Sequence, residues 1–232
     1  MIESRDNETL KLVRKLQERR WRDKLGLFAC EGEDLVAAAT AEPVELLIAG
    51  ENVEPKLLAQ VSSAGHPPRV IGIYRRADLP APAARPVTLV LHRVSDPGNV
   101  GTLIRTADAF GGGVVLTKGC ADPTGPKALR ASAGAIWRVP LLVRDSDDGT
   151  LPPANDASVA SHKVVALSSS GGFPIAGCDL RGPVAFLLGA EREGLPGELP
   201  RDLDAWIPIA SESLNVAAAG AIALYEWGRQ NP

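Results

Sequence analysis

The chain has 232 residues, of which 45% are hydrophobic and 23% are charged, and its formal net charge is −3. This length can bury one large core, or one ordinary core with a small second domain. No apolar run is long enough to cross a bilayer, and the first residues, MIESRDNETLKLVRK, lack the apolar segment of a secretion signal. We therefore expect a globular cytoplasmic protein without a membrane partner.

The N-terminal residues carry an excess of positive charge. Residues 1–24 hold eight Lys or Arg against five Asp or Glu, which leaves this segment at about +3 and the rest of the chain at about −6. Leu10, Val13 and Leu16 share one helical stripe after Asn7, a good N-cap, and this predicts an amphipathic helix over 7–20 with a basic outer face. Such a helix attracts phosphate locally, although a solvated helix face would have the same composition.

Short strands and helices alternate up to Leu79, which predicts a small α/β domain over residues 1–79. Strands are expected within 25–32, 43–50 and 69–74, and helices within 33–41 and 54–65. The next segment, PAPAARP (80–86), is stiffened by prolines that cannot donate ladder hydrogen bonds. We therefore place a linker at 80–86 and a second domain over 87–232.

The second domain alternates apolar strand candidates with helices. Strands are expected within 87–94, 113–119, 136–143, 163–170, 183–190 and 204–210, and helices near 100–110, 125–134 and 214–230, with an extra turn at 196–202. The strand candidates are mostly continuous runs of Val, Leu and Ile, which is typical of a parallel sheet covered on both faces. The predicted fold class is α/β, with a parallel sheet flanked by helices and a small N-terminal α/β domain.

Cysteine spacing gives no sign of a metal site. Cys30, Cys120 and Cys178 are far apart and form no CxxC pair. An odd number at wide spacing argues against a disulfide framework as well as a zinc site. We expect all three to be small buried side chains, and we expect no bound metal.

Three turns that follow predicted strands carry polar residues: SDPGNVGTLIRTADAFG (95–111), LLGAEREGLPGELP (187–200) and IPIASESLNVAAAGAIALYEW (207–227). Ligands of parallel sheets bind beyond the carboxyl ends of strands. Each turn alone also has a structural explanation, since Asp96 to Asn99 is favourable turn chemistry and Ser213 would cap the last helix. The sequence contains no P-loop, no GxGxxG between strand and helix, no GxSxG and no HExxH, so nucleotide hydrolysis and the corresponding hydrolase chemistries are excluded.

Together and in this order, the segments DPGNVGTLIRTADAFG, LLGAEREGLP and IPIA…SLNVAAAGAIALYEW resemble the three motifs of the SpoU/TrmH family of RNA ribose 2'-O-methyltransferases, within the SPOUT superfamily. The segment NETLKLVRKL…RDKLGLFACEG is similar to the ribosomal-protein-like substrate-binding domain of many members. The resemblance implies a C-terminal trefoil knot, S-adenosylmethionine held by the knot loops, and a homodimer with active sites at the interface. The catalytic positions it implies are Asn99, Arg105, Glu191, Ser213 and Asn215.

The resemblance also implies a cofactor pocket, built largely from backbone groups. Its expected lining residues are Gly189, Ile207, Leu214, Ile209 and Leu167. Between IPI and SLN this chain has only Ala210, Ser211 and Glu212, where relatives usually have a longer loop. The shortened loop leaves Ile209 or Ala210 as alternatives to Ile207.

Methyl transfer from a sulfonium to a ribose hydroxyl is a direct displacement that needs positioning and loss of a proton, and it does not require a metal. Arg105 stays protonated, so we expect it to stabilise the developing alkoxide rather than act as a general base. The other catalytic positions would orient Arg105, the hydroxyl and the motif loops. We expect the dimer to use the helix over 214–227, whose small Ala217, Ala218 and Ala221 permit close approach.

The added N-terminal domain indicates the substrate. A domain similar to a ribosomal RNA binder is most simply explained by a structured ribosomal RNA target, in the large subunit. Phosphate contacts that position RNA without reading bases are expected from Lys11, Arg14, Arg20, Arg22 and Lys24. The alternatives are a tRNA substrate, or a catalytically silent RNA-binding or ribosome-assembly protein that keeps the fold.

Overall fold

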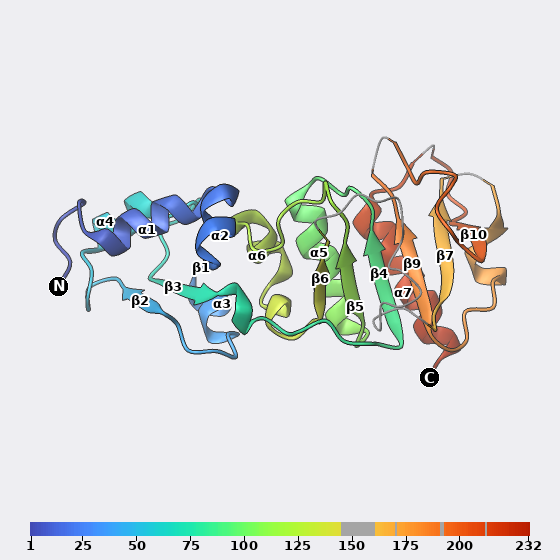
Figure 1. The fold of residues 1–232 in the computed structure, drawn as a ribbon, viewed down its shortest axis with the longest axis horizontal. Coiled ribbons are helices and arrows are strands. Elements are labelled where there is room, and N and C mark those ends of the chain that lie inside the picture. The colour runs from blue at the N-terminus through green and yellow to red at the C-terminus, as the bar shows by residue number, and fades with distance from the viewer. Residues whose placement is uncertain (145–160, 170, 191–192, 212) are drawn as a thin grey trace.

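The computed structural model describes residues 1–144, 161–169, 171–190, 193–211 and 213–232. The molecule is elongated, with a three-stranded sheet near the N-terminus and a seven-stranded sheet toward the C-terminus (Figure 1). Within these ranges, no helix combines the length and the apolar character that a membrane span requires.

The N-terminal unit is an antiparallel sheet with helices packed on it. Its strands lie in the order β1-β3-β2, with bounds β1 (Leu27–Glu31), β2 (Glu45–Ile48) and β3 (Val70–Arg75). Its helices are α1 (Glu8–Leu16), α2 (Arg19–Leu25), α3 (Glu33–Ala37) and α4 (Pro55–Val61), followed by a 3-10 turn at Arg76–Asp78. The predicted stripe Leu10, Val13 and Leu16 is fully buried against this sheet and α4.

The helix expected over 7–20 is two helices in the structure. Asn7 caps α1 as predicted, because its Oδ1 accepts hydrogen bonds from the N–H groups of Thr9 (2.9 Å) and Leu10 (3.3 Å). Glu18 then takes an extended conformation (φ −97°, ψ 133°), which ends the first helix and lets α2 start in a new direction. As a result α2 turns one side toward the second sheet, where Arg22 is buried.

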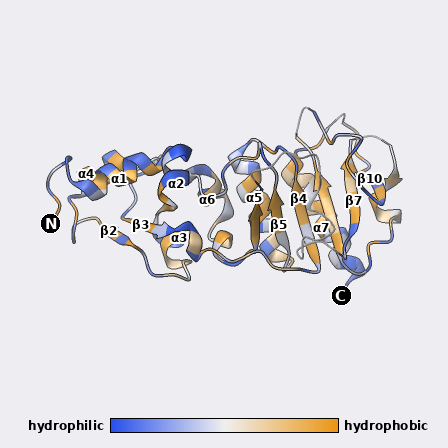
Figure 2. Cartoon of the chain, viewed as in Figure 1, coloured by the Kyte–Doolittle hydropathy of each residue, from blue (hydrophilic) through white to orange (hydrophobic). Residues whose placement is uncertain are grey.

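The C-terminal sheet is parallel throughout, in the order β6-β5-β4-β9-β7-β10-β8. Its strands are β4 (Val87–Leu91), β5 (Gly113–Leu116), β6 (Leu141–Val143), β7 (Lys163–Ser168), β8 (Phe173–Pro174), β9 (Val184–Leu188) and β10 (Leu203–Trp206). Every residue of β4, β5 and β9 is buried, which confirms the prediction from their continuous apolar sequence. These strands form the hydrophobic band at the centre of the sheet (Figure 2).

The helices α5 (Pro97–Ala109), α6 (Pro126–Ser132) and α7 (Val216–Gln230) complete this unit. Residues of α5 and α7 share one core with the sheet, and on the opposite face Leu195 and Leu199 join the cluster of Val90 and Val115. The strand predicted within 136–143 is only partly correct, because Ala135–Trp137 is a 3-10 turn. The short strand β8 was not predicted, and the knot stays a prediction from the resemblance.

The two sheets share one hydrophobic core. The ring of Phe28 lies 5.5 Å from that of Trp137, and the ring of Tyr74 lies 4.8 Å from it, measured between centroids. Phe28 and Tyr74 belong to the N-terminal sheet, whereas Trp137 follows α6. The division at 80–86 therefore stays a prediction, and the two units are packed as one body.

Candidate functional site

A cavity of about 440 Å³ lies beyond the carboxyl ends of three neighbouring strands, β9, β7 and β10. This volume is within the usual range of small-molecule sites, and the position is the one where parallel sheets bind ligands. All five residues predicted to hold the cofactor line it, and so does the predicted Ser213: Leu167, Gly189, Ile207, Ile209, Leu214 and Ser213. Three segments distant in sequence are thus brought together.

Residues on either side of the short loop at 210–212 line the cavity. Ile207 and Ile209 both contribute to the wall, so the structure does not choose between them and both stay predicted cofactor residues. Ile207 also packs on the hydrophobic core, whereas Ile209 is 36% exposed. Ala210 is not among the described residues that form the lining.

Gly189 serves the cavity by allowing a close backbone approach. A Cβ at this position would lie 2.7 Å from the backbone nitrogen of Leu195 and would overlap the carbonyl group of Gly194. Gly194 and Leu195 line the same cavity, and the Gly194 N–H donates to the Ala190 carbonyl at 2.9 Å. A side chain at Gly189 would therefore displace the wall of the cavity rather than merely fill its space.

A second constellation joins the first and third motifs. Asn215 caps α7, because its Oδ1 accepts from the N–H groups of Ala217 (2.9 Å) and Ala218 (3.2 Å), and its Nδ2 donates to Asn99 Oδ1 at 3.1 Å. These two predicted residues, 116 positions apart, are thus in direct contact. Asn215 also starts the helix that follows the cavity residues Ser213 and Leu214.

The position of Asn99 is set by the cap of α5. Its N–H donates to Asp96 Oδ1 at 3.0 Å, while Asp96 Oδ2 accepts from Lys127 Nζ of α6 at 2.8 Å. The hydrogen bond from Lys127 and that from the Asn99 backbone hold the pKa of Asp96 below its ordinary value. The carboxylate therefore stays charged at neutral pH and keeps the first turn of α5 in place.

Arg105 lies apart from both constellations. It is exposed on α5, about 9 Å along the axis from Asn99 at 1.5 Å per residue and on a different side of the helix. It is absent from the described lining of the cavity, and it forms no ion pair with another residue in the described part of the chain. Glu191, the remaining predicted catalytic residue, is outside the described residues.

The basic residues of the N-terminal helices divide into two groups. Lys11, Arg14, Arg20 and Lys24 reach the surface of the molecule. Arg22 does not, and the prediction that it contacts RNA phosphate is wrong for this structure: its side chain is 5% exposed and pairs with Asp122 at 2.7 Å. The break before α2 turns Arg22 inward, where burial of an arginine requires an acidic partner.

Sequence reasoning missed Trp21, which lies among the exposed basic residues of α1 and α2. Lys15, Arg20 and Lys24 each place their charge 5.2–5.7 Å from the centre of its ring. The signal was available, since an aromatic residue between closely spaced cations is a common feature of nucleic-acid-binding surfaces.

Two other predictions concern cysteines and metals. Cys30, Cys120 and Cys178 are free and buried, as predicted, and burial raises the pKa of the Cys30 thiol to about 12. Across the part of the chain that the structure describes, no group of His, Cys, Asp and Glu is arranged to hold a metal ion.

Comparison with known proteins connects these features to one family. The model of the SpoU rRNA Methylase family matches residues 86–225. The chain is 32% identical over 247 residues to the Bacillus subtilis 23S rRNA (guanosine(2553)-2'-O)-methyltransferase RlmP, and the match covers 97% of both chains.

Two solved structures extend the likeness to three dimensions. An AdoMet-bound rRNA methyltransferase from Sinorhizobium meliloti has a TM-score of 0.83 at 29% identity, covering 98% of this chain and 97% of that one. The SpoU methyltransferase AviRb from Streptomyces viridochromogenes, in complex with the cofactor AdoMet, has a TM-score of 0.81 at 25% identity, with 97% and 98% covered. Both likenesses include the N-terminal unit as well as the parallel sheet.

Proposed function

Because the chain belongs to the SpoU rRNA methylase family, we propose that it transfers a methyl group from S-adenosylmethionine (AdoMet) to a ribose 2'-hydroxyl of large-subunit ribosomal RNA. The observation that carries this proposal is the cavity at the ends of β9, β7 and β10, because all five residues predicted to hold the cofactor line it. A cytoplasmic location is part of the same proposal.

The cavity fits AdoMet in its chemistry as well as its position. Gly189 and Gly194 present backbone to it, Leu167, Ile207 and Leu214 provide apolar walls, and the described part of its lining includes no Lys. Its only described arginine, Arg201, is paired with Asp204 at 3.1 Å. A cationic ligand therefore meets no unpaired positive charge there. When bound, AdoMet supplies a methyl group activated by its sulfonium.

The residues of this chain then have distinct tasks. Asn99 and Asn215 hold the start of α5 against the start of α7, which positions Ser213 and Leu214 at the cavity. Arg105 supplies a charged donor fork that stabilises the alkoxide forming on the ribose and grips the neighbouring phosphate. It remains protonated throughout, so the hydroxyl proton leaves to solvent or to another group.

The separation of Arg105 from the cavity of its own chain supports a homodimer with composite sites. In such a dimer each protomer would present its Arg105 to the cavity of the partner. The outer side of α7 offers an apolar surface for this contact, with Ala218 and Ala221 partly exposed, Ile222 37% exposed and Tyr225 64% exposed. Ala217, which we expected on the same surface, is instead buried within the chain.

Methyl transfer to a defined RNA tests the proposed function. Purified protein is incubated with AdoMet carrying a labelled methyl group and either a 23S rRNA transcript or a tRNA transcript, and the digested nucleosides are separated. We expect a single 2'-O-methylated nucleoside from the 23S transcript. A methylated base, or a product from tRNA alone, would contradict the proposal, and the absence of AdoMet binding would favour a silent RNA-binding protein.

Mixing two impaired variants, assayed at limiting AdoMet, tests the composite site. The Arg105→Ala chain keeps an intact cofactor cavity but lacks the arginine donor. The Gly189→Ala chain keeps the arginine donor but has a damaged cofactor cavity. Co-expressed chains should recover part of the wild-type rate, because one of the two sites in a mixed dimer is intact. No recovery, or a monomer by light scattering at micromolar concentration, would contradict the dimer.

A further inference from the structure

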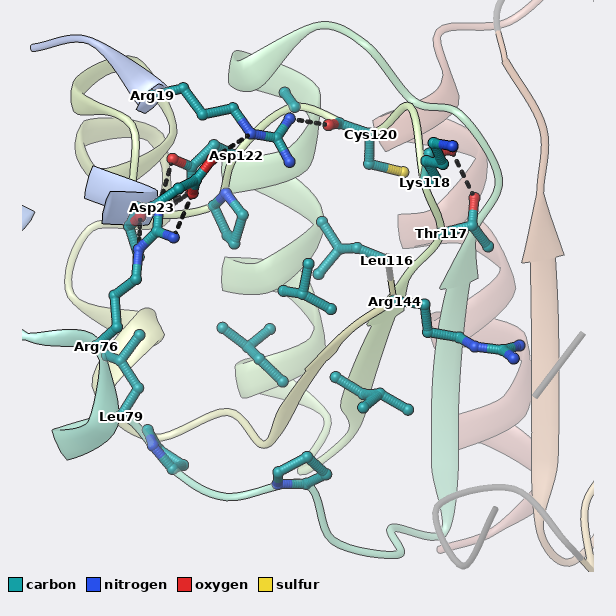
Figure 3. A pocket seen from close by; sticks show the side chains of 18 of the residues that line it. Arg19, Asp23, Arg76, Leu79, Leu116, Thr117, Lys118, Cys120, Asp122 and Arg144 are labelled. Atoms are coloured by element: carbon teal, nitrogen blue, oxygen red, sulfur yellow. Dashed lines mark hydrogen bonds and ion pairs between the residues drawn. The ribbon is translucent and has the colours of Figure 1, made fainter. Parts of the chain in front are cut away.

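A larger cavity of about 730 Å³ lies between the N-terminal unit and the parallel sheet, and it shares no lining residue with the cofactor cavity. It opens beyond the carboxyl ends of β5 and β6 (Figure 3). One wall comes from α2, the 3-10 turn after β3 and the start of the linker, and the other from the loop between β5 and α6. We call it the inter-unit cleft.

The walls of the inter-unit cleft are held at a fixed distance by an ionic network. Asp122, on one wall, accepts from Arg22 Nε and Arg76 Nη2 at 2.7 Å each; Arg76 lines the opposite wall, and Arg22 is buried on α2 behind that wall. Arg19 also crosses the cleft and donates to the Cys120 carbonyl at 3.2 Å, as Figure 3 shows. Because the Asp122 side chain is only 7% exposed, the network forms a firm base rather than a surface contact.

The lining of the cleft combines an apolar floor with a basic rim. Leu79 and Pro80 face it from the linker side, and Leu116 and Leu141 from the sheet. Lys118 is exposed at the rim, and among the described residues its ammonium group makes no hydrogen bond or ion pair; only its carbonyl is bonded, by the Thr117 hydroxyl at 3.4 Å. Such a lining suits a ligand with a flat, weakly polar part and a negative charge, which is the chemistry of a nucleotide.

A row of positive charge leads from the cleft toward the cofactor cavity. Arg144, Lys118 and Arg93 come within two residues after β6, β5 and β4, which are adjacent strands. Arg93 adopts a left-handed conformation (φ 54°) and packs against Gly119. A Cβ atom added at Gly119 would lie 3.3 Å from the Cγ of Arg93. Its Nη1 lies 3.5 Å from Glu193 Oε2, and Glu193 lines the cofactor cavity. Neighbouring strands are about 4.8 Å apart, so the row is continuous.

We propose that the inter-unit cleft binds an unpaired nucleotide of the RNA substrate, at a second site away from the nucleotide that is methylated. The base packs on Leu79 and Pro80, which are partly exposed, its phosphate pairs with Lys118, and the basic row guides the strand to the cofactor cavity. Single-stranded RNA is bound in this way elsewhere, by basic grooves that hold phosphates and by surfaces that take unstacked bases. The inference rests on the proposed function, since it assumes an RNA substrate.

Two matched pairs of variants test the cleft. Ala81 and Ala84 are both exposed on the linker, but only Ala81 lines the cleft. Lys118 lies on its rim, whereas Lys56 is exposed on α4, at the far end of the molecule (Figure 1). The variants are Ala81→Glu with Ala84→Glu as control, and Lys118→Ala with Lys56→Ala as control.

The probe is a fluorescein-labelled single-stranded decauridine, and its dissociation constant is measured by anisotropy over a series of salt concentrations. We expect Ala81→Glu and Lys118→Ala to raise this constant about tenfold and the controls to change it less than twofold. Loss of one phosphate contact should lower the salt slope by about 0.7 in Lys118→Ala. Equal constants for cleft variants and controls would overturn the inference. An unchanged AdoMet affinity in all four variants verifies that each is folded.

Failure of this inference can be told apart from failure of the proposed function, because decauridine binding does not depend on methyl transfer. If the wild type methylates 23S rRNA while the cleft variants bind decauridine as tightly as the controls do, the cleft proposal is wrong and the function stands. If the wild type transfers no methyl group but the cleft variants lose affinity, the cleft is an RNA site in a protein without the proposed activity.

Discussion

The cofactor cavity and the inter-unit cleft lie along the same edge of one parallel sheet, yet they are built from different parts of the chain. The cofactor cavity is formed mainly by strand ends and the loops directly after them, with glycine backbone and small or apolar side chains. The cleft is formed by charged side chains from four separate segments, which an internal ionic network holds together. The first site depends on close backbone approach, and the second depends on electrostatic pairing between two units.

This difference determines how each site should respond to mutation and to pH. A cavity of close-packed backbone is sensitive to single added carbon atoms, and the described charged side chains in its wall, Glu193, Arg201 and Asp204, each have an ion-pair partner. A cleft held by a buried carboxylate is sensitive to loss of charge, and its stability depends on protonation. The following predictions test this contrast, from the largest expected effect to the smallest.

Asp122→Ala should lower the free energy of unfolding by about 3–5 kcal/mol, because it leaves the buried Arg22 guanidinium without its charged partner. Urea denaturation followed by circular dichroism measures the change. The control is Asp179→Ala, whose carboxylate pairs with Arg181 on the surface, with both side chains more than half exposed. That pair should contribute far less, because both of its charges are exposed to solvent. Equal losses for the two variants would contradict a structural role for the network.

The same carboxylate predicts a dependence on pH. Burial on its own would raise the pKa of Asp122, but the charges of Arg76 and Arg22 and the hydrogen bonds from Thr124 outweigh it, so the pKa lies below its ordinary value of 3.8. The stabilisation is therefore complete above pH 3.8 and is lost as the pH falls through the lowered value. The stability difference between wild type and Asp122→Asn should be constant from pH 5 to 7 and shrink only in stronger acid.

Arg105→Ala should lower the turnover number by about 10²–10³-fold, since one charged donor to a developing oxyanion typically has an effect of that size. AdoMet affinity should change by no more than a few fold, because Arg105 is not among the described residues of the cofactor cavity. Single-turnover transfer rates and calorimetric AdoMet titrations measure the two quantities. Arg105→Lys keeps the charge without the planar fork, so its turnover number should lie between those of the wild type and Arg105→Ala. Near-normal turnover in Arg105→Ala would refute the mechanism.

Gly189→Ala should weaken AdoMet binding at least tenfold, because the added Cβ meets the backbone of Gly194 and Leu195. Gly197→Ala is the matched control, since a Cβ there has nothing within 4 Å and the position is exposed. Decauridine binding should be unchanged in both variants, which separates this site from the inter-unit cleft. If Gly189→Ala had wild-type AdoMet affinity, the cofactor would have to bind at a different site.

The sequence predicted the parallel sheet because continuous apolar runs indicated β4, β5 and β9. The residues expected around the cofactor came from the resemblance to the SpoU/TrmH motifs, and the structure brings them together at one cavity, where their role stays a prediction. Arg22 could not be placed in the same way, since a basic residue in a basic segment looks exposed until its partner, 100 positions away, is known. The break at Glu18 was missed for a related reason: nothing in the local sequence forbids helix there, and packing of α2 on the second unit decides it.

The effect of removing the N-terminal domain also depends on contacts between the two units that the sequence does not reveal. From the sequence alone, removing residues 1–80 is the natural test of whether the N-terminal domain binds RNA. The structure shows that this would strip Phe28 and Tyr74 from the buried Trp137 and remove both arginines from Asp122. Loss of activity would then report unfolding. Reversing surface charges, at Lys11 and Lys24 for example, is the sharper experiment.

The smallest effect concerns Asn215, which has two roles that substitution can separate. Asn215→Ala removes the cap of α7 and should cost about 1 kcal/mol of stability, whereas serine caps helices about as well as asparagine does. Asn215→Ser should therefore keep stability within about 0.5 kcal/mol, but its shorter side chain cannot span the distance to Asn99. If the Asn99–Asn215 contact positions the site, Asn215→Ser will lose methyl-transfer rate at unchanged stability. If its only role is to cap the helix, Asn215→Ser will be fully active, and the link between the first and third motifs will have no part in catalysis.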